Sequence, residues 1–118
     1  MNIQIRARDF TLTDGLREHI AWRVAYATNH GRDAVSRVVV HLSDVNGPRG
    51  GADKRCGIEL RLKGTPQSLV VEDVQSDLYV AIDRAFERIG RSLLRNLSRR
   101  RDFAAVSAAR HDLQEESS

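Results

Sequence analysis

The sequence predicts a two-layer α+β domain with the element order β-α-β-β-β-α, in which two helices cover one face of a four-stranded sheet. Several segments alternate apolar and polar residues, which is typical of half-buried strands. Two other segments repeat apolar residues at steps of three and four, which is typical of amphipathic helices. The chain has 118 residues, which suits one domain whose core needs no disulfide or metal.

The chain opens with a predicted strand and helix. In residues 1–8 apolar and polar side chains alternate, with Ile3 and Ile5 on one side. Thr13 is suited to cap the helix that follows, since a threonine hydroxyl accepts a hydrogen bond from a free amide of the first turn. Apolar residues then recur at Leu16, Ile20, Val24 and Ala27. This helix is predicted to end near Gly31.

Three more strands are predicted, at residues 37–45, 55–63 and 67–74. The middle one shows the clearest alternation, and its inward positions are Cys56, Ile58, Leu60 and Leu62. A glycine-rich loop at 46–53 and a turn at 64–66 connect the three strands. Short connections between consecutive strands favour an antiparallel meander.

A long helix ends the predicted domain. Ser76 or Asp77 is expected to cap it, and we expect it to run to about Arg101. Its apolar side holds Leu78, Ile82, Phe86, Ile89, Leu93 and Leu97. Five arginines, here called the arginine stripe, lie nearly opposite: Arg84, Arg88, Arg91, Arg95 and Arg99. Because the apolar side packs on the sheet, the arginine stripe is predicted to face solvent.

Charge divides the chain into two parts. Residues 1–101 carry 18 basic and 12 acidic residues, whereas residues 102–118 carry one basic and four acidic residues. We therefore predict a domain at 1–101 and an acidic-ended tail at 102–118 that is disordered at its end, since it has few large apolar residues. A basic body favours a polyanionic partner. A genome rich in arginine codons explains the composition equally well, so total charge alone does not decide.

The arginine stripe argues more strongly for an anionic partner. Like charges four residues apart each cost roughly a few tenths of a kcal/mol in a helix. Asp83 and Glu87 are expected to relieve part of this repulsion by pairing with neighbouring arginines. A solvated face is the alternative reading, but such a face normally mixes both signs of charge. Since the guanidinium fork suits phosphate, nucleic acid is the favoured partner.

Residues outside the stripe extend the predicted RNA-binding set. Arg17 and Arg23 lie on the first helix and add positive charge. The glycine-rich loop lets backbone amides approach a phosphate, and it brings Arg49, Lys54 and Arg55 with it. A plain hairpin connection is the alternative reading of this loop, because it lacks the spacing of a phosphate-loop motif.

The pattern also narrows the mode of nucleic-acid binding. The outer face of the predicted sheet has no aromatic residue and carries Arg6, Arg8, His41, Arg55, Glu59 and Arg61. Base stacking on the sheet is therefore disfavoured, and a single cysteine excludes a zinc finger. Trp22 and Tyr26 are predicted to pack at the edge of the core rather than to stack on bases. The mode of binding that remains is recognition of the backbone and shape of a folded RNA.

Nothing in the sequence predicts catalysis, a cofactor, a metal or a small-molecule substrate. The histidines lack metal-ligand spacing, and His41, Ser43 and Asp44 follow one another too closely on a strand to form a triad. Cys56 is expected to be an inert core thiol, and a lone cysteine fits a reducing cytoplasm. Apolar runs are too short for a membrane helix, and no export signal is visible. We expect a cytoplasmic, non-enzymatic protein.

Two stretches of the chain resemble the bacterial ribosome hibernation-promoting factor and ribosome-associated inhibitor A family, also called sigma-54 modulation proteins. The first is the segment DLYVAID at 77–83, followed by the basic positions of the last helix. The second is Thr11-Leu12-Thr13 with Leu16-Arg17-Glu18 opening the first helix. Their order and spacing together make the resemblance specific, and it covers about residues 1–101.

This resemblance implies a fold similar to double-stranded-RNA-binding domains and a translation inhibitor that is monomeric off the ribosome. Such proteins bind the decoding channel of the small ribosomal subunit, where they overlap the tRNA and messenger positions and silence translation under stress. The family's basic contacts to ribosomal RNA correspond here to Arg17, Arg23, Arg88, Arg91, Arg95 and Arg99. Arg84 has no clear family equivalent, so its place in the set rests on the stripe alone.

The chain resembles the short, single-domain form of the family. On this resemblance we expect no extra C-terminal domain of the kind by which long members pair ribosomes, and the loop at 46–53 is longer than in other short members. The tail does not match that of the inhibitor A branch in sequence, so promotion or prevention of ribosome pairing stays open. Two further functions also stay open: a protein-interaction regulator of transcription, and a general structured-RNA-binding module.

Overall fold

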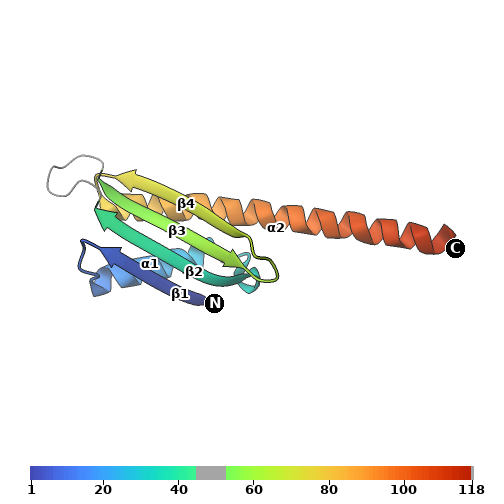
Figure 1. Cartoon of the computed structure of the whole chain (residues 1–118), viewed down its shortest axis with the longest axis horizontal. Coiled ribbons are helices and arrows are strands. Elements are labelled where there is room, and N and C mark those ends of the chain that lie inside the picture. Colours follow the sequence, from blue (N-terminus) through green and yellow to red (C-terminus); the bar gives the residue numbers. More distant parts are fainter. Residues whose placement is uncertain (45–52, 118) are drawn as a thin grey trace.

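The structure, a computed structural model, describes residues 1–44 and 53–117, with only the backbone described at 103–105 and 107–117. Two helices pack against one face of a four-stranded sheet, and α2 continues far beyond it (Figure 1). The predicted α+β fold and its β-α-β-β-β-α order are therefore confirmed. The elements are β1 (Asn2–Arg8), α1 (Asp14–Ala27), a 3-10 turn η1 (Arg32–Ala34), β2 (Val35–Asp44), β3 (Lys54–Leu62), β4 (Ser68–Gln75) and α2 (Leu78–Ser117).

The sheet has the order β1-β2-β3-β4 and is mixed. β1 pairs with β2 in parallel, with Arg6 opposite His41 and Arg8 opposite Ser43. β2, β3 and β4 form the predicted antiparallel meander. The parallel pair follows from the connection, because α1 carries the chain back across the sheet before β2 begins.

The core lies between the sheet and the two helices. The inward residues of β3 and the apolar sides of both helices meet there, as predicted, and Phe86 is the largest fully buried side chain. Val39 is also buried, although the alternation predicts it on the outer face. β2 lies between β1 and β3, so side chains of both neighbouring strands flank Val39 on the outer face.

α1 begins as predicted and ends earlier than predicted. The Thr13 hydroxyl accepts a hydrogen bond from the Leu16 amide at 3.2 Å. The helix ends at Ala27, and Thr28 is its C-cap, so the predicted end near Gly31 is wrong. The buried Thr28 hydroxyl donates to the Val24 carbonyl at 2.8 Å, which supplies a partner to a carbonyl of the last turn.

α2 begins at the predicted place and is longer than predicted. The Asp77 carboxylate accepts a hydrogen bond from the Tyr79 amide at 2.8 Å, so Asp77 rather than Ser76 is the cap. The helix continues to Ser117, and the predicted end near Arg101 is wrong. Residues 102–117 contain four alanines and no glycine or proline, which favours continuation of a helix. The division into a domain at 1–101 and a tail at 102–118 stays a prediction.

Candidate nucleic-acid interface

The arginine stripe occupies an exposed flank of α2. Its five side chains are all exposed, whereas the opposite side of the helix, including Ile82, Phe86, Ile89 and Leu93, is buried against the sheet. The prediction of a solvent-facing row of arginines is therefore confirmed. The helical rise places its outermost members, Arg84 and Arg99, about 22 Å apart along the axis.

The first part of the stripe is held by β4. Arg88 donates a hydrogen bond to the Glu72 carbonyl at 2.7 Å. The Asp73 carboxylate lies 3.7 Å from Arg88 and 3.9 Å from Arg84. Asp83, expected to pair with these arginines, instead turns toward α1. The repulsion within the stripe is thus relieved by the neighbouring strand rather than by Asp83.

The second part of the stripe is open. No carboxylate within the described side chains forms an ion pair with Arg91, Arg95 or Arg99, and Arg95 donates a hydrogen bond to the Ser92 hydroxyl at 3.4 Å. Arg100 and Arg101 follow directly, and Arg101 is exposed. The prediction omitted these two, although the run Arg99-Arg100-Arg101 is visible in the sequence. This half of the helix therefore offers uncompensated positive charge to an anion.

The two predicted arginines of α1 lie in different surroundings. Arg23 donates to the Asp83 carbonyl at 2.8 Å, and its Nε lies 3.4 Å from the Asp83 carboxylate. Its side chain is only 13% exposed, so it joins the two helices rather than standing free. Arg17 is exposed. It lies two residues, about 200° of helical turn, before His19, which contacts Asp83. Arg17 therefore faces away from α2.

The residues predicted around the glycine-rich loop are engaged by carboxylates where they are described. The Lys54 ammonium lies 2.7 Å from Asp44 and 3.4 Å from the buried Asp53. The hydrogen bond to Asp44 raises the pKa of Lys54 above its ordinary value. Arg55 lies 3.2 Å from Glu72. Arg49 and the predicted loop as far as residue 52 lie outside the described residues.

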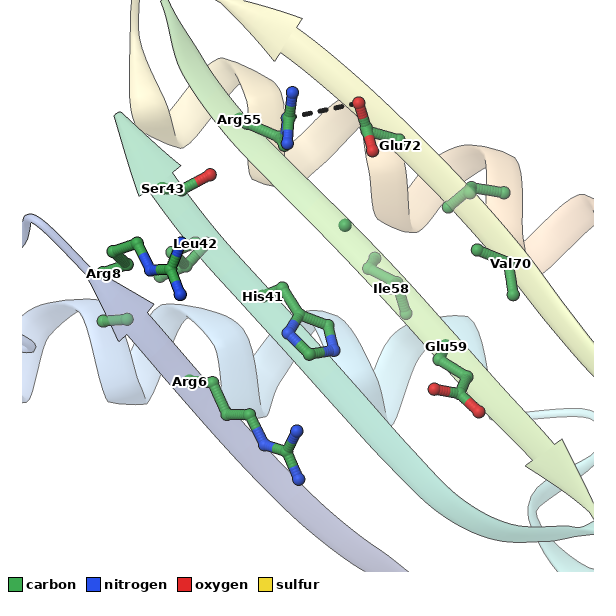
Figure 2. A pocket seen from close by; sticks show the side chains of 13 residues that line it. Arg6, Arg8, His41, Leu42, Ser43, Arg55, Ile58, Glu59, Val70 and Glu72 are labelled. Atoms are coloured by element: carbon green, nitrogen blue, oxygen red, sulfur yellow. Dashed lines mark ion pairs between the residues drawn. The ribbon is translucent and has the colours of Figure 1, made fainter. Parts of the chain in front are cut away.

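A second basic cluster lies on the outer face of the sheet, in a shallow hollow of about 700 Å³. Figure 2 shows Arg6 and Arg8 of β1 beside His41 of β2, across the sheet from the Arg55–Glu72 ion pair. Arg6 and Arg8 are exposed and form no ion pair with a described carboxylate. The predicted RNA-binding set omitted both, although the alternation in residues 1–8 places them on this face.

Other chemistry is sparse in the part of the chain that the structure describes. Cys56 is buried, and burial raises the pKa of its thiol to about 12, which agrees with the predicted inert core thiol. No group of three or more His, Cys, Asp or Glu side chains is placed to hold a metal ion there. Among the described helices, none combines the length and hydrophobicity needed to cross a membrane.

Trp22 and Tyr26 do not pack at the edge of the core. Their side chains are 60% and 69% exposed, so that prediction is wrong. They lie four residues apart on the outward-facing side of α1, and their rings stack on each other. The helical periodicity of the sequence places Trp22 and Tyr26 off the buried side of α1. It does not show whether another element of the fold covers these two side chains.

The fold and the site define a small two-layer domain with a basic helical flank. Residues 3–101 match the family model described as "Sigma 54 modulation protein / S30EA ribosomal protein". The chain belongs to this family, whose members are non-enzymatic ribosome-binding regulators. This membership confirms the resemblance and the expectation that the chain is not an enzyme.

The solved structures that are similar to this chain include the following two. One is the N-terminal domain of Protein Y from Thermus thermophilus, with 29% identity and a TM-score of 0.66 over 80% of this chain and 98% of that one. The other is a ribosomal subunit interface protein from Coxiella burnetii, with 17% identity and a TM-score of 0.70 over 83% of this chain and 99% of that one. The second shows a shared fold alone. A search of curated proteins gave no significant match.

Proposed function

We propose that this chain is a translation inhibitor that binds ribosomal RNA of the small subunit in the decoding channel and excludes tRNA and messenger RNA. Two findings support it: membership of a family of ribosome-binding regulators and a fold shared with a ribosomal subunit interface protein. In this proposal the chain acts in the cytoplasm, as a monomer off the ribosome, and silences translation under stress.

One observation carries the proposal: the open half of the arginine stripe. Arg91, Arg95 and Arg99 are exposed at four-residue steps on one flank of a rigid helix. The helical rise spaces them about 6 Å apart, so they present a row of guanidinium forks to a phosphate backbone. Arg84 and Arg88 extend the row, and phosphates can compete with Asp73 for them because both arginine side chains are exposed and both ion pairs are long.

The mechanism is steric and electrostatic. When the arginines of the helix bind phosphates, they release the counterions of the RNA. The binding constant therefore falls by about 0.7 to 0.9 log units per phosphate contact for each tenfold rise in salt concentration. Three open arginines give a log–log slope of about −2 to −3, and engagement of all five gives about −3.5 to −4.5. The bound domain occupies space that tRNA and messenger RNA need, which requires no catalytic group.

Sedimentation of stationary-phase lysate through a sucrose gradient tests the proposal. The chain is expected to migrate with small subunits or whole ribosomes, and to return to the top of the gradient at high salt. A protein-interaction regulator would instead stay in a protein complex that survives nuclease treatment. A general RNA-binding module would bind free duplex RNA as tightly as small subunits.

A second measurement tests inhibition itself. Purified chain added to a cell-free translation reaction is expected to lower protein synthesis in proportion to the ribosomes occupied. A messenger and initiator tRNA bound beforehand should protect the ribosomes, because the proposed site is then filled. Equal inhibition of pre-bound and free ribosomes would contradict binding in the decoding channel.

A further inference from the structure

A groove separates the outer sides of α1 and α2. Its hollow has a volume of about 610 Å³, and its lining includes Trp22, Tyr26, Gly90, Arg91 and Leu94. The helices are close at Gly90, where a Cβ would lie in ordinary contact with Ala27, at 3.6 Å. The groove therefore has an aromatic wall on α1 and a wall on α2 that includes Arg91 of the arginine stripe.

The aromatic wall is an exposed stacked pair. The rings of Trp22 and Tyr26 are nearly parallel, with 17° between their planes and 5.8 Å between their centroids. Both side chains are mostly exposed, and Leu94 across the groove is exposed as well. Exposed large apolar side chains that gather in one groove indicate a binding surface.

Two arginines, Arg23 and Arg91, and one carboxylate, Glu87, line the groove beside this wall. The Arg23 guanidinium lies 5.9 Å from the centre of the Trp22 ring, within the range of a cation–π contact. Arg91 lines the groove and also belongs to the open half of the arginine stripe. A backbone that follows the stripe therefore reaches the groove at Arg91, where a base can turn onto the aromatic pair.

We propose that this groove binds an unpaired nucleobase of the RNA whose backbone lies on the arginine stripe. The inference rests on the proposed function and specifies its ligand: a duplex that carries a bulged or flipped nucleotide, rather than a perfect duplex. The base stacks on Trp22 and Tyr26, and the phosphate beside it binds Arg91. Aromatic side chains bind bases in this way without strong sequence preference.

The single tryptophan of the chain makes the inference directly measurable. We suggest titrating the full chain with two RNA duplexes of equal length, one perfect and one with a single bulged nucleotide, while recording tryptophan fluorescence. The bulged duplex is expected to quench Trp22 and to bind about 5- to 150-fold more tightly, since stacking contributes about 1–3 kcal/mol per base. Equal affinities without quenching would overturn the inference.

Substitutions locate the effect. Tyr26→Ala and Trp22→Ala are expected to remove the preference for the bulged duplex, whereas Trp22→Phe retains a stacking ring and should keep most of it. Val70→Ala is the matched control, because Val70 is 71% exposed on β4, outside the groove. If Val70→Ala lowers the preference as much as Trp22→Ala, the inference is wrong.

Two outcomes separate this inference from the proposed function. If the chain sediments with ribosomes but does not distinguish the two duplexes, the groove inference fails and the proposed function stands. If fluorescence changes with protein concentration in the absence of RNA, the groove binds a second copy of the chain and the inference is likewise overturned. Failure to sediment with ribosomes contradicts the proposed function, whatever the duplexes show.

Discussion

Arg23 of α1 donates a hydrogen bond to the backbone carbonyl of Asp83 in α2, at 2.8 Å. The Asp83 carboxylate also contacts His19 of α1, at 2.7 Å. One residue of α2 thus receives two side chains of α1, one turn apart. These contacts hold the two helices side by side, and they fix the side of α2 that remains for the arginine stripe.

Arg23→Ala is expected to lower the free energy of unfolding by about 1–3 kcal/mol, because a charged donor to a backbone carbonyl is lost from a largely buried position. Urea denaturation measures the change. Arg17→Ala is the matched control: Arg17 is exposed, so its loss should change stability by no more than about 0.5 kcal/mol. If Arg23→Ala leaves stability intact but weakens ribosome binding, Arg23 contacts RNA and its structural role is refuted.

Asp73→Asn is expected to strengthen binding to small subunits. The substitution removes the negative charge that lies 3.7 Å from Arg88 and 3.9 Å from Arg84, while an amide oxygen can still accept the hydrogen bond from Gln75. Both arginines then become available to phosphate, and the salt dependence should steepen by about one to two contacts. Binding assays across a salt series measure this. Weaker binding by Asp73→Asn would contradict the competition between Asp73 and RNA.

Two glycines near the helix pair are expected to respond oppositely to alanine. Gly31→Ala places a Cβ 2.4 Å from Leu97 and 3.3 Å from Leu93, so α2 side chains must move and stability should fall by about 1 kcal/mol. Gly90→Ala meets Ala27 at an ordinary 3.6 Å and should stabilise α2 by about 0.5–1 kcal/mol. Thermal unfolding of both variants checks the signs. A stabilised Gly31→Ala would show that α2 does not approach this turn closely.

Cys56 is expected to make the fold sensitive to alkali. The folded thiol has a pKa of about 12 against an ordinary value of 9.0, so between these values the unfolded chain loses a proton that the folded chain keeps. The free energy of unfolding should therefore fall as pH rises through this range, by up to about 1.4 kcal/mol per pH unit. Urea denaturation of wild type and Cys56→Ala at pH 8 to 11 isolates this contribution. Equal slopes would refute it.

The same burial predicts slow labelling of the native thiol. Alkylation at pH 8 should be far slower in the folded chain than in urea, since burial leaves far less thiolate. Fast labelling without denaturant would show that β3 opens readily.

The periodicity of the sequence predicts the fold well because burial follows it. Alternation from Cys56 to Leu62 and the helical repeat from Leu78 to Leu93 both identify faces that the structure buries. The caps at Thr13 and Asp77 are local interactions, so they are visible in the sequence as well. The C-terminal end of α2 could not be predicted in the same way. Residues 102–117 contain no glycine or proline that would end a helix, and they have too few apolar residues to show whether the segment packs on the domain.

The candidate site is predicted less completely from the sequence. Whether each of its arginines forms an ion pair or stays open depends on residues that are distant in sequence. Periodicity places Arg84 and Arg88 on the exposed flank, but only the docking of α2 beside β4 brings Asp73 to them. Arg23 similarly looks like a surface arginine until α2 brings Asp83 to it. For Trp22 and Tyr26, the pattern does not reveal that both helices leave an open groove.

The most direct test of the central claim compares two variants with equal change in charge. Arg91→Glu with Arg95→Glu reverses two open arginines of the stripe, and Arg6→Glu with Arg8→Glu reverses two unpaired arginines on the outer sheet face. Both should keep the circular dichroism spectrum of the wild type. In co-sedimentation with purified small subunits, we predict that the stripe variant is lost from the pellet while the sheet variant remains. Retention of the stripe variant, or equal loss of both, would contradict binding through the arginine stripe.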